Sequence, residues 1–155
     1  MEIPITIGRA TLSDLEEIVA IEESCLSSEE IVNYEFLEES IRKIADTLLV
    51  ARDENQLLGY VLGESQSLHP TWIEIRSFAI HPDHRGQGLG TLLLASLKQV
   101  AVEGGDEYLR LTCPDDLLSY FEMNGFVAGE LLEASYARFS GWNLIWANPF
   151  YQEEV

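Results

Sequence analysis

The sequence contains no hydrophobic run long enough to cross a membrane. Its longest apolar stretches, such as residues 92–94 and 145–147, fall far short of the ~20 residues that a transmembrane helix needs. Residues 1–4 also lack the basic and apolar regions that begin a signal peptide. We therefore expect a cytoplasmic protein without a membrane partner.

Cysteine and histidine are too few and too scattered for the common metal sites. Cys25 and Cys113 are far apart and form neither a paired zinc knuckle nor a Cys-x-x-Cys motif. His69, His81 and His84 cluster loosely, but no second group of ligands stands at metal-binding spacing. We expect two reduced thiols and no metal.

Basic residues are scarce, with 9 Lys and Arg against 27 Asp and Glu and a formal net charge of −18. A surface of this sign repels a phosphate backbone, so we expect no nucleic-acid partner. The same field would attract a small cationic substrate, although the charge could equally serve solubility alone.

The chain has the length and composition of one soluble globular domain. It has 155 residues, of which 46% are hydrophobic and 23% charged, so it can bury one core. The sequence shows no repeat, low-complexity stretch or Pro/Gly/Ser linker. We expect a single domain that spans 1–155.

Hydrophobic periodicity predicts alternating strands and helices. The expected strands are 3–8, 47–52, 57–63, 72–81, 108–113, 126–136 and 142–148. The expected helices are 13–24, with Ser13 and Glu16 as a capping box, 29–45, the segment from the glycine-rich turn to 104, and 114–124. This order predicts an α/β fold of the α+β three-layer type, a mixed sheet with helices on both faces.

The predicted strand 72–81 changes phase along its length. Ile73 and Ile75 place apolar side chains at odd positions, whereas Phe78 and Ile80 place them at even positions. One extra residue near position 76 or 77, inserted as a β-bulge, would produce this change of face. Because bulges are enriched beside active sites, the strand is a candidate site element.

Three glycines at alternate positions follow this strand and open the next helix: Gly86, Gly88 and Gly90. Successive backbone N–H groups of such a turn can point into one concavity, and the helix N-terminus adds a partial positive charge. The turn is therefore a candidate cradle for a diphosphate. It contains neither the Gly-Lys pair of a P-loop nor the Gly-x-Gly-x-x-Gly of a dinucleotide fold. The alternative is that the glycines only make a tight turn.

Two motifs give the sequence a family resemblance. Arg85-Gly86-Gln87-Gly88-Leu89-Gly90, preceded by Phe78-Ala79-Ile80-His81-Pro82, resembles the Arg/Gln-x-x-Gly-x-Gly/Ala hallmark of the GNAT superfamily of acyl-CoA-dependent N-acyltransferases. The stretch 120–126, Tyr-Phe-Glu-Met-Asn-Gly-Phe, is similar to that family's helix-end signature. Within the superfamily, residues 113–117 and 21–37 look most like the arylalkylamine N-acetyltransferase branch.

The resemblance implies a mostly antiparallel GNAT-like sheet with a bulged fourth strand, and acetyl-CoA as co-substrate. The pantetheine would pair with the bulged strand, the pyrophosphate would lie on the amides of the glycine-rich turn, and Phe121 would face the thioester. The implied cofactor-binding residues are Phe78, Ala79, Ile80, Arg85, Gly86, Gln87, Gly88, Leu89, Gly90, Thr91 and Phe121.

The resemblance also implies catalytic residues. Glu74 stands where many relatives carry a glutamate that accepts the substrate's proton; the alternative is that it only pairs with Arg76. The usual proton-donating tyrosine falls at Phe121, and the nearest tyrosine is Tyr120. Three alternatives follow: Tyr120 itself, another group such as Tyr34 or Cys113, or water, because a thiol pKa near ~8.5 makes thiolate a fair leaving group.

The expected acceptor is a small-molecule primary amine. The alternatives are a protein or peptide amine, and a catalytically silent regulator that only binds acyl-CoA. The sequence leaves open whether the protein is a monomer or a homodimer.

Overall fold

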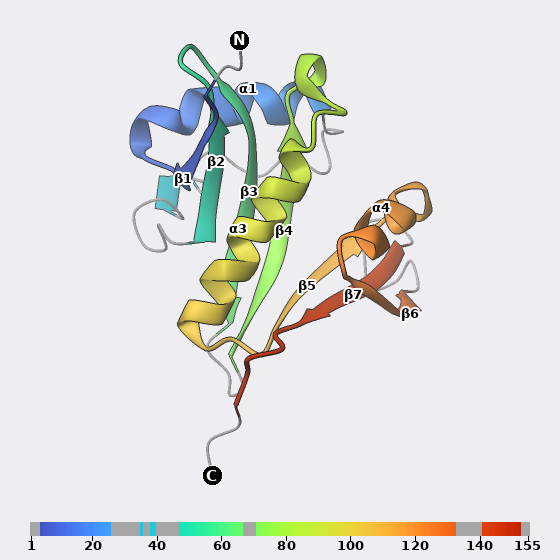
Figure 1. The fold of residues 1–155 in the computed structure, drawn as a ribbon. Helices are drawn as coiled ribbons and strands as arrows, with labels where there is room; N and C mark the ends of the chain where they lie inside the picture. Colours follow the sequence, from blue (N-terminus) through green and yellow to red (C-terminus); the bar gives the residue numbers. More distant parts are fainter. Residues whose placement is uncertain are drawn as a thin grey trace. The chain divides into compact units, whose positions relative to one another are not determined.

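The computed structural model describes residues 4–25, 35, 38–39, 47–66, 71–132 and 141–152. Within these residues, seven strands are hydrogen-bonded in the order β1 (Thr6–Arg9), β2 (Leu48–Arg52), β3 (Leu57–Gln66), β4 (Trp72–Ile80), β5 (Tyr108–Cys113), β7 (Gly141–Ala147) and β6 (Val127–Leu132) (Figure 1). The pairs β1–β2, β2–β3, β5–β7 and β6–β7 are antiparallel, whereas β4–β5 is parallel. This is the mixed, mostly antiparallel sheet that the sequence predicts.

The chain divides into two compact units. Unit 1 consists of Met1–Glu64 and Arg76–Leu97, and unit 2 of Ser65–Ile75 and Lys98–Val155. The strand β4 (Trp72–Ile80) and the helix α3 (Leu89–Gly104) each contribute to both units. A single domain over 1–155 remains a prediction. In the described part of the chain, no helix has the length and apolar character of a membrane span.

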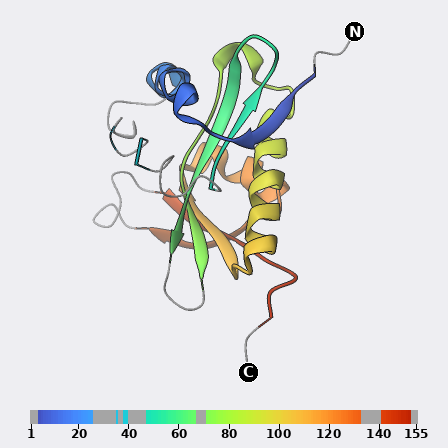
Figure 2. The ribbon, with the colours of Figure 1, turned by 90° about the vertical axis from the view of Figure 1, so that its left-hand side faces the viewer.

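Unit 1 places helices on both faces of its strands, as predicted. Figure 2 shows α1 and the first part of α3 on opposite sides of the strands. Besides its parts of β4 and α3, unit 1 contains β1 (Thr6–Arg9), η1 (Leu12–Asp14), α1 (Leu15–Cys25), β2 (Leu48–Arg52), η3 (Pro82–His84) and, up to Glu64, β3 (Leu57–Gln66). The predicted helix over 29–45 lies largely outside the described residues.

The core of unit 1 forms where α1 packs on β2 and β3. Leu15, Ile18 and Ile21 recur at every third position of α1, so they share one helix face, and each is buried. They join a cluster that also contains Ala10, Leu48, Val50, Leu57, Tyr60, Leu62 and Ala79.

The start of the first helix differs from the prediction. A 3-10 turn precedes α1, and Asp14 accepts a hydrogen bond from the Thr11 N–H at 2.7 Å. The capping pair is therefore Thr11 and Asp14, and the predicted pair of Ser13 and Glu16 is wrong. The reason is the 3-10 turn, which begins the helical segment two residues earlier than the apolar periodicity indicates.

The apolar residues of β4 change phase as the sequence shows, but the buried face of the strand stays the same, so the predicted change of face is wrong. Ile73, Ile75, Ser77 and Ala79 are all buried, so the buried positions alternate without interruption. Ser77 can occupy a buried position because its hydroxyl is 2.8 Å from the Tyr60 hydroxyl and is therefore hydrogen-bonded. The inserted residue of a β-bulge stays a prediction.

Unit 2 contains β5 (Tyr108–Cys113), η4 (Asp115–Leu117), α4 (Leu118–Met123), β6 (Val127–Leu132) and β7 (Gly141–Ala147). These strands and the short helix agree with the predicted segments. The end of the predicted strand 126–136 lies outside the described residues. Leu109, Leu111 and Leu144 are buried, as alternation along β5 and β7 predicts.

The predicted end of α4 at Asn124 and Gly125 is confirmed as a Schellman motif. The Gly125 N–H donates to the Glu122 carbonyl at 3.0 Å, and the Phe126 N–H donates to the Phe121 carbonyl at 3.1 Å. Gly125 has a φ of +88°, which glycine adopts without strain. The Phe121 and Phe126 rings pack edge to face at 5.8 Å and complete the motif.

Candidate functional site

The loop between η3 and α3 in unit 1 is open above its backbone. Gly86 and Gly88 have φ values of +79° and +81°, in the left-handed region that favours glycine. A Cβ added to either residue would meet no atom within 4 Å. The glycines therefore give the loop its conformation and leave its outer surface free of side chains.

The loop leads directly into the N-terminus of α3. The first bond of the helical ladder runs from the Leu92 N–H to the Gly88 carbonyl at 3.2 Å, so the amides of residues 89–91 have no acceptor within the helix. A helix of 16 residues adds a partial positive charge at this end. The open loop and the uncapped helix start together offer backbone N–H groups to an anion, and we call residues 85–91 the glycine cradle.

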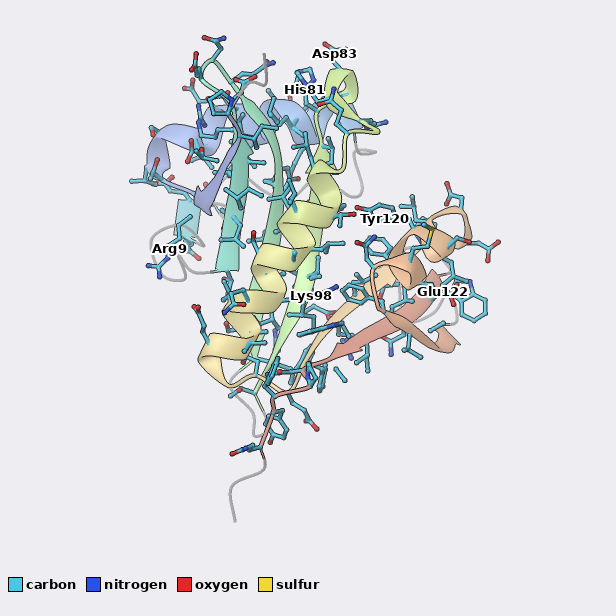
Figure 3. All side chains as sticks on the ribbon, in the orientation of Figure 1. Arg9, His81, Asp83, Lys98, Tyr120 and Glu122 are labelled. Carbon is cyan, nitrogen blue, oxygen red and sulfur yellow. The ribbon has the colours of Figure 1, made fainter. Side chains whose placement is uncertain are left out.

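Two histidines hold the turn that precedes the cradle. The His81 N–H donates to the Leu58 carbonyl at 2.7 Å, and His81 Nδ1 accepts from the Asp83 N–H at 3.1 Å (Figure 3). His84 Nε2 is 2.9 Å from Gln56 Nε2. These contacts attach the turn to β3 and to the β2–β3 hairpin.

The candidate cofactor strand lies in the same unit as the cradle. Ala79 is buried, and Phe78 and Ile80 are half-buried. The exposed Arg85 returns to this strand, because its Nε donates to the Ile80 carbonyl at 3.4 Å. Unit 1 therefore contains the candidate cofactor-binding residues 78–80 of β4 and all candidate residues of the glycine cradle.

Gly59 is a residue of this region that the sequence analysis missed. A Cβ there would lie 2.7 Å from Ile80 Cδ1 and 2.9 Å from the Ala79 carbonyl oxygen. The absent side chain lets β3 approach the candidate cofactor strand closely. An isolated glycine within a strand pattern is the signal that could have identified it.

Unit 2 contains Glu74, which forms a two-point ion pair. Arg110 Nε donates to Glu74 Oε2 at 3.0 Å, and Arg110 Nη2 donates to Oε1 at 3.1 Å. The two residues stand opposite each other in the parallel β4–β5 ladder. The expected alternative pairing of Glu74 with Arg76 is wrong, because Arg76 binds Glu64 at 2.7 Å.

Arg110 is fixed from a second direction by aromatic rings. Its guanidinium carbon lies 4.7 Å from the Trp72 ring centroid, and Trp72 stacks on Tyr108 at 5.1 Å. The carboxylate of Glu74 raises the pKa of Arg110, first through the hydrogen bond between them. Glu74, with 14% of its side chain exposed, is therefore a fixed and oriented carboxylate.

Tyr120 and Phe121 are neighbours on α4 with different surroundings. Phe121 is only 5% exposed, and its ring lies edge-on between Tyr120 at 5.2 Å and Phe126 at 5.8 Å. Tyr120 is half-buried. The structure thus places both in unit 2 with Glu74. Tyr34, another candidate proton donor, lies outside the described residues.

Cys113 at the end of β5 is poorly suited to covalent chemistry. Burial, and after it the nearby carboxylates of Asp116, Asp115 and Glu122, together raise the pKa of its thiol to about 11. The side chain is buried. A thiol that stays protonated at neutral pH is a weak nucleophile.

A hollow of about 500 Å³ also lies in unit 1, between β1, β2 and η1. Its lining includes Gly8 and Arg52 but none of the predicted site residues. Arg52 is already paired with Asp14 and, at 2.9 Å, with Glu17. The hollow is therefore separate from the cradle.

Comparisons with known proteins find a matching family and similar folds. The model of the acetyltransferase (GNAT) family matches residues 13–126, which include every candidate site residue. Ard1 from Thermoplasma volcanium has a similar structure, with a TM-score of 0.80 at 19% identity over 91% of this chain and 95% of that chain.

Two further structures carry ligands. The yncA protein of Salmonella typhimurium with its cofactor acetyl-CoA gives a TM-score of 0.78 at 18% identity, over 98% of each chain. Naa50 of Arabidopsis thaliana, in complex with the bisubstrate analogue CoA-Ac-MVNAL, gives 0.78 at 11% identity over 91% of this chain and 97% of that chain. At these identities the likeness establishes the shared fold.

Proposed function

Because the chain belongs to the acetyltransferase (GNAT) family, we propose that it transfers the acetyl group of acetyl-CoA to a primary amine of a small molecule. The observation that carries this proposal is the glycine cradle. Gly86 and Gly88 keep it open, and it ends at the N-terminus of a long helix. A formal charge of −18 would repel an anion from most of the surface, so a local site that favours anions supports a specific anionic ligand.

Acetyl-CoA offers a group that fits each part of unit 1. Its pyrophosphate would lie on the amides of the cradle, with Thr91 beside it, because successive N–H groups there have no acceptor within α3. Its extended pantetheine would run along Phe78, Ala79 and Ile80 as an additional strand. The chemistry that acetyl-CoA supplies is an activated acyl group on a thiolate leaving group.

The proposed reaction is a direct displacement. The amine nitrogen attacks the thioester carbonyl carbon, the new C–N bond forms, and the C–S bond then breaks to release the CoA thiolate. An ammonium must first lose a proton, and Glu74 accepts it directly or through water. Arg110 uses two of the roughly four lone-pair positions of this carboxylate, so the others can accept a proton.

The thiolate must then gain a proton. Tyr120 is the candidate donor on α4, because Phe121 has no hydroxyl and is buried. Water can serve instead, since a thiol with a pKa near ~8.5 leaves readily as thiolate. The raised pKa of Cys113, about 11, argues against a covalent intermediate on its thiol and supports direct transfer from acetyl-CoA to the amine.

Two other functions have a specific observation behind them. A peptide amine is an alternative acceptor, because Naa50, a protein of similar fold, was studied with an analogue that contains the peptide MVNAL. A silent acyl-CoA-binding regulator is the other, because the position of the family's usual tyrosine is the buried Phe121. The arylalkylamine branch remains a prediction.

A thiol-release assay with acetyl-CoA and a panel of amines and peptides separates these functions. We expect CoA release with small primary amines. Release only with peptides would make the acceptor a peptide, and tight acetyl-CoA binding without release would favour the regulator.

The cradle itself is tested by Gly88→Val and calorimetric titration of acetyl-CoA. Valine at a φ of +81° is strained, and its side chain enters the open space, so we expect at least about tenfold weaker binding. Gly8→Val is the matched control, because Gly8 also faces open space but lies on β1 without a positive φ. Equal acetyl-CoA affinity in folded Gly88→Val and wild type would contradict the cradle assignment.

A further inference from the structure

The C-terminal end of α4 is bound by a lysine from another helix. Lys98 of α3 donates from Nζ to the carbonyl oxygen of Asn124 at 2.5 Å. Asn124 is the C-cap residue of α4, where carbonyl groups lack partners within the helix. A cation at this end also interacts favourably with the helix dipole. Figure 3 marks Lys98 on α3, and Tyr120 and Glu122 on α4.

Asn124 is itself hydrogen-bonded to residues of the helix-end signature 120–126. Its side-chain amide donates to the Tyr120 carbonyl at 2.8 Å, and its backbone N–H donates to the Phe121 carbonyl at 3.0 Å. The Phe126 N–H donates to the same Phe121 carbonyl at 3.1 Å. The residue that Lys98 holds is therefore hydrogen-bonded to both candidate residues of α4.

Two aromatic rings lie beside the ammonium group of Lys98. Lys98 Nζ lies 5.8 Å from the Phe126 ring centroid and 5.6 Å from that of Trp146, both within the range of cation–π attraction. Burial lowers the pKa of Lys98. The ammonium group is thus partly removed from water. In these surroundings its hydrogen bond and its ring contacts are stronger than on an open surface.

The turn has little room to move away from Lys98. A Cβ added to Gly125 would lie 3.4 Å from Trp146 Cδ1 and 3.6 Å from Lys98 Nζ. The turn, the ammonium and the indole are therefore close-packed, and the positive φ of Gly125 fixes the chain direction at the same point.

We propose that Lys98 is a positioning residue, which anchors the turn 121–126 and so fixes Tyr120 and Phe121 for acetyl transfer; this role rests on the proposed function. Lys98 also belongs to the helix whose first residues form the glycine cradle.

The anchor is tested without any assay of activity, by amide hydrogen exchange in Lys98→Met. Methionine keeps the apolar stem but removes the charge and the donor. We expect exchange at the Gly125 and Phe126 amides to accelerate about tenfold, the factor for one lost hydrogen bond from a charged donor. Gln99→Met is the control, because Gln99 is exposed on the same helix and its side chain binds Glu103 within that helix. Unchanged exchange in Lys98→Met would overturn the proposal.

The positioning role is tested by steady-state kinetics of the same variants. We expect Lys98→Met to lower kcat about tenfold while KM for acetyl-CoA changes less than about twofold, and Gln99→Met to leave both unchanged. Faster exchange with unchanged kcat would make Lys98 a purely structural residue and overturn positioning. If the wild type transferred acetyl to no amine, the proposed function and the positioning role would both fail, and the exchange data would still decide the anchor.

Discussion

Glu74 and Arg110 form an ion pair between β4 and β5 that orients the carboxylate we propose as the base. Arginine presents a rigid fork that matches a carboxylate, and Trp72 orients that fork by stacking. The carboxylate is then held in one orientation before substrate arrives. An oriented base needs less rearrangement to reach the transition state than a mobile one.

The first residue-scale prediction concerns the proton of the acceptor amine. Glu74→Gln should lower kcat about 10²-fold at neutral pH, and less at high pH, where the amine is already neutral. The pH–rate profile is the measurement. Glu64→Gln is the matched control, since Glu64 also pairs with an arginine through one bond of 2.7 Å, but the pair is exposed and contributes little. An identical profile for Glu74→Gln and wild type would remove Glu74 from the mechanism.

The second residue-scale prediction concerns Cys113. Its pKa of about 11 leaves about one thiol in 10⁴ ionised at pH 7, so Cys113→Ala should retain full turnover. Because the folded pKa exceeds the usual value near 9, the folded state binds the proton more tightly, and stability should fall as pH rises from about 9 to 11. Urea titrations across this range would show a decline that is smaller in Cys113→Ala. A large loss of turnover in Cys113→Ala would contradict direct transfer and favour a covalent intermediate on Cys113.

At the scale of elements, the candidate cofactor strand depends on its neighbour β3. Gly59→Ala would press a methyl group against the Ala79 backbone and Ile80. We expect destabilisation of about 1–3 kcal/mol in urea unfolding, together with weaker acetyl-CoA binding. Gly8→Ala on β1 meets no atom, so it should be neutral or stabilising by about 0.5–1 kcal/mol. Equal stability of the two variants would show that β3 tolerates the added methyl group.

Sequence patterns predict an element well where the residues of that element alone determine its conformation. Asn124 and Gly125 end α4 because only the glycine accepts a φ of +88° there, and this requirement is visible in the sequence. The strands of the β2–β3 hairpin are likewise predicted by their turn, where Asp53 accepts hydrogen bonds from the amides of Asn55 and Gln56.

The remaining errors arise where long-range contacts decide. Apolar alternation in β4 indicates a change of face, yet Ser77 is buried because Tyr60 on another strand provides its hydrogen bond. The glycine motif predicts the cradle residues, but the parallel register that pairs Arg110 with Glu74 has no local signal in either segment. Lys98 was missed for the same reason, since its partners are 26 or more residues away in sequence.

At the scale of the whole molecule, the charge of −18 should act oppositely on the two substrates. Salt screens attraction and repulsion alike, so kcat/KM for a dicationic amine should fall about tenfold between roughly 0.02 and 0.5 M salt, while acetyl-CoA binds more tightly. Kinetics and calorimetry at several salt concentrations would show these opposite slopes. Two flat responses would assign the charge to solubility alone.

The way β4 and α3 each belong to both compact units limits how this fold can be divided. The chain passes between the units after Glu64, after Ile75 and after Leu97, so no single cut in the gene separates them. A fragment that ends at Leu97 would keep Ile73, which is 1% exposed in the whole chain, but lose its β5 partner Leu109. Such a fragment presents an unpaired apolar strand edge and should aggregate. We therefore expect recombination between genes to move this fold as one piece.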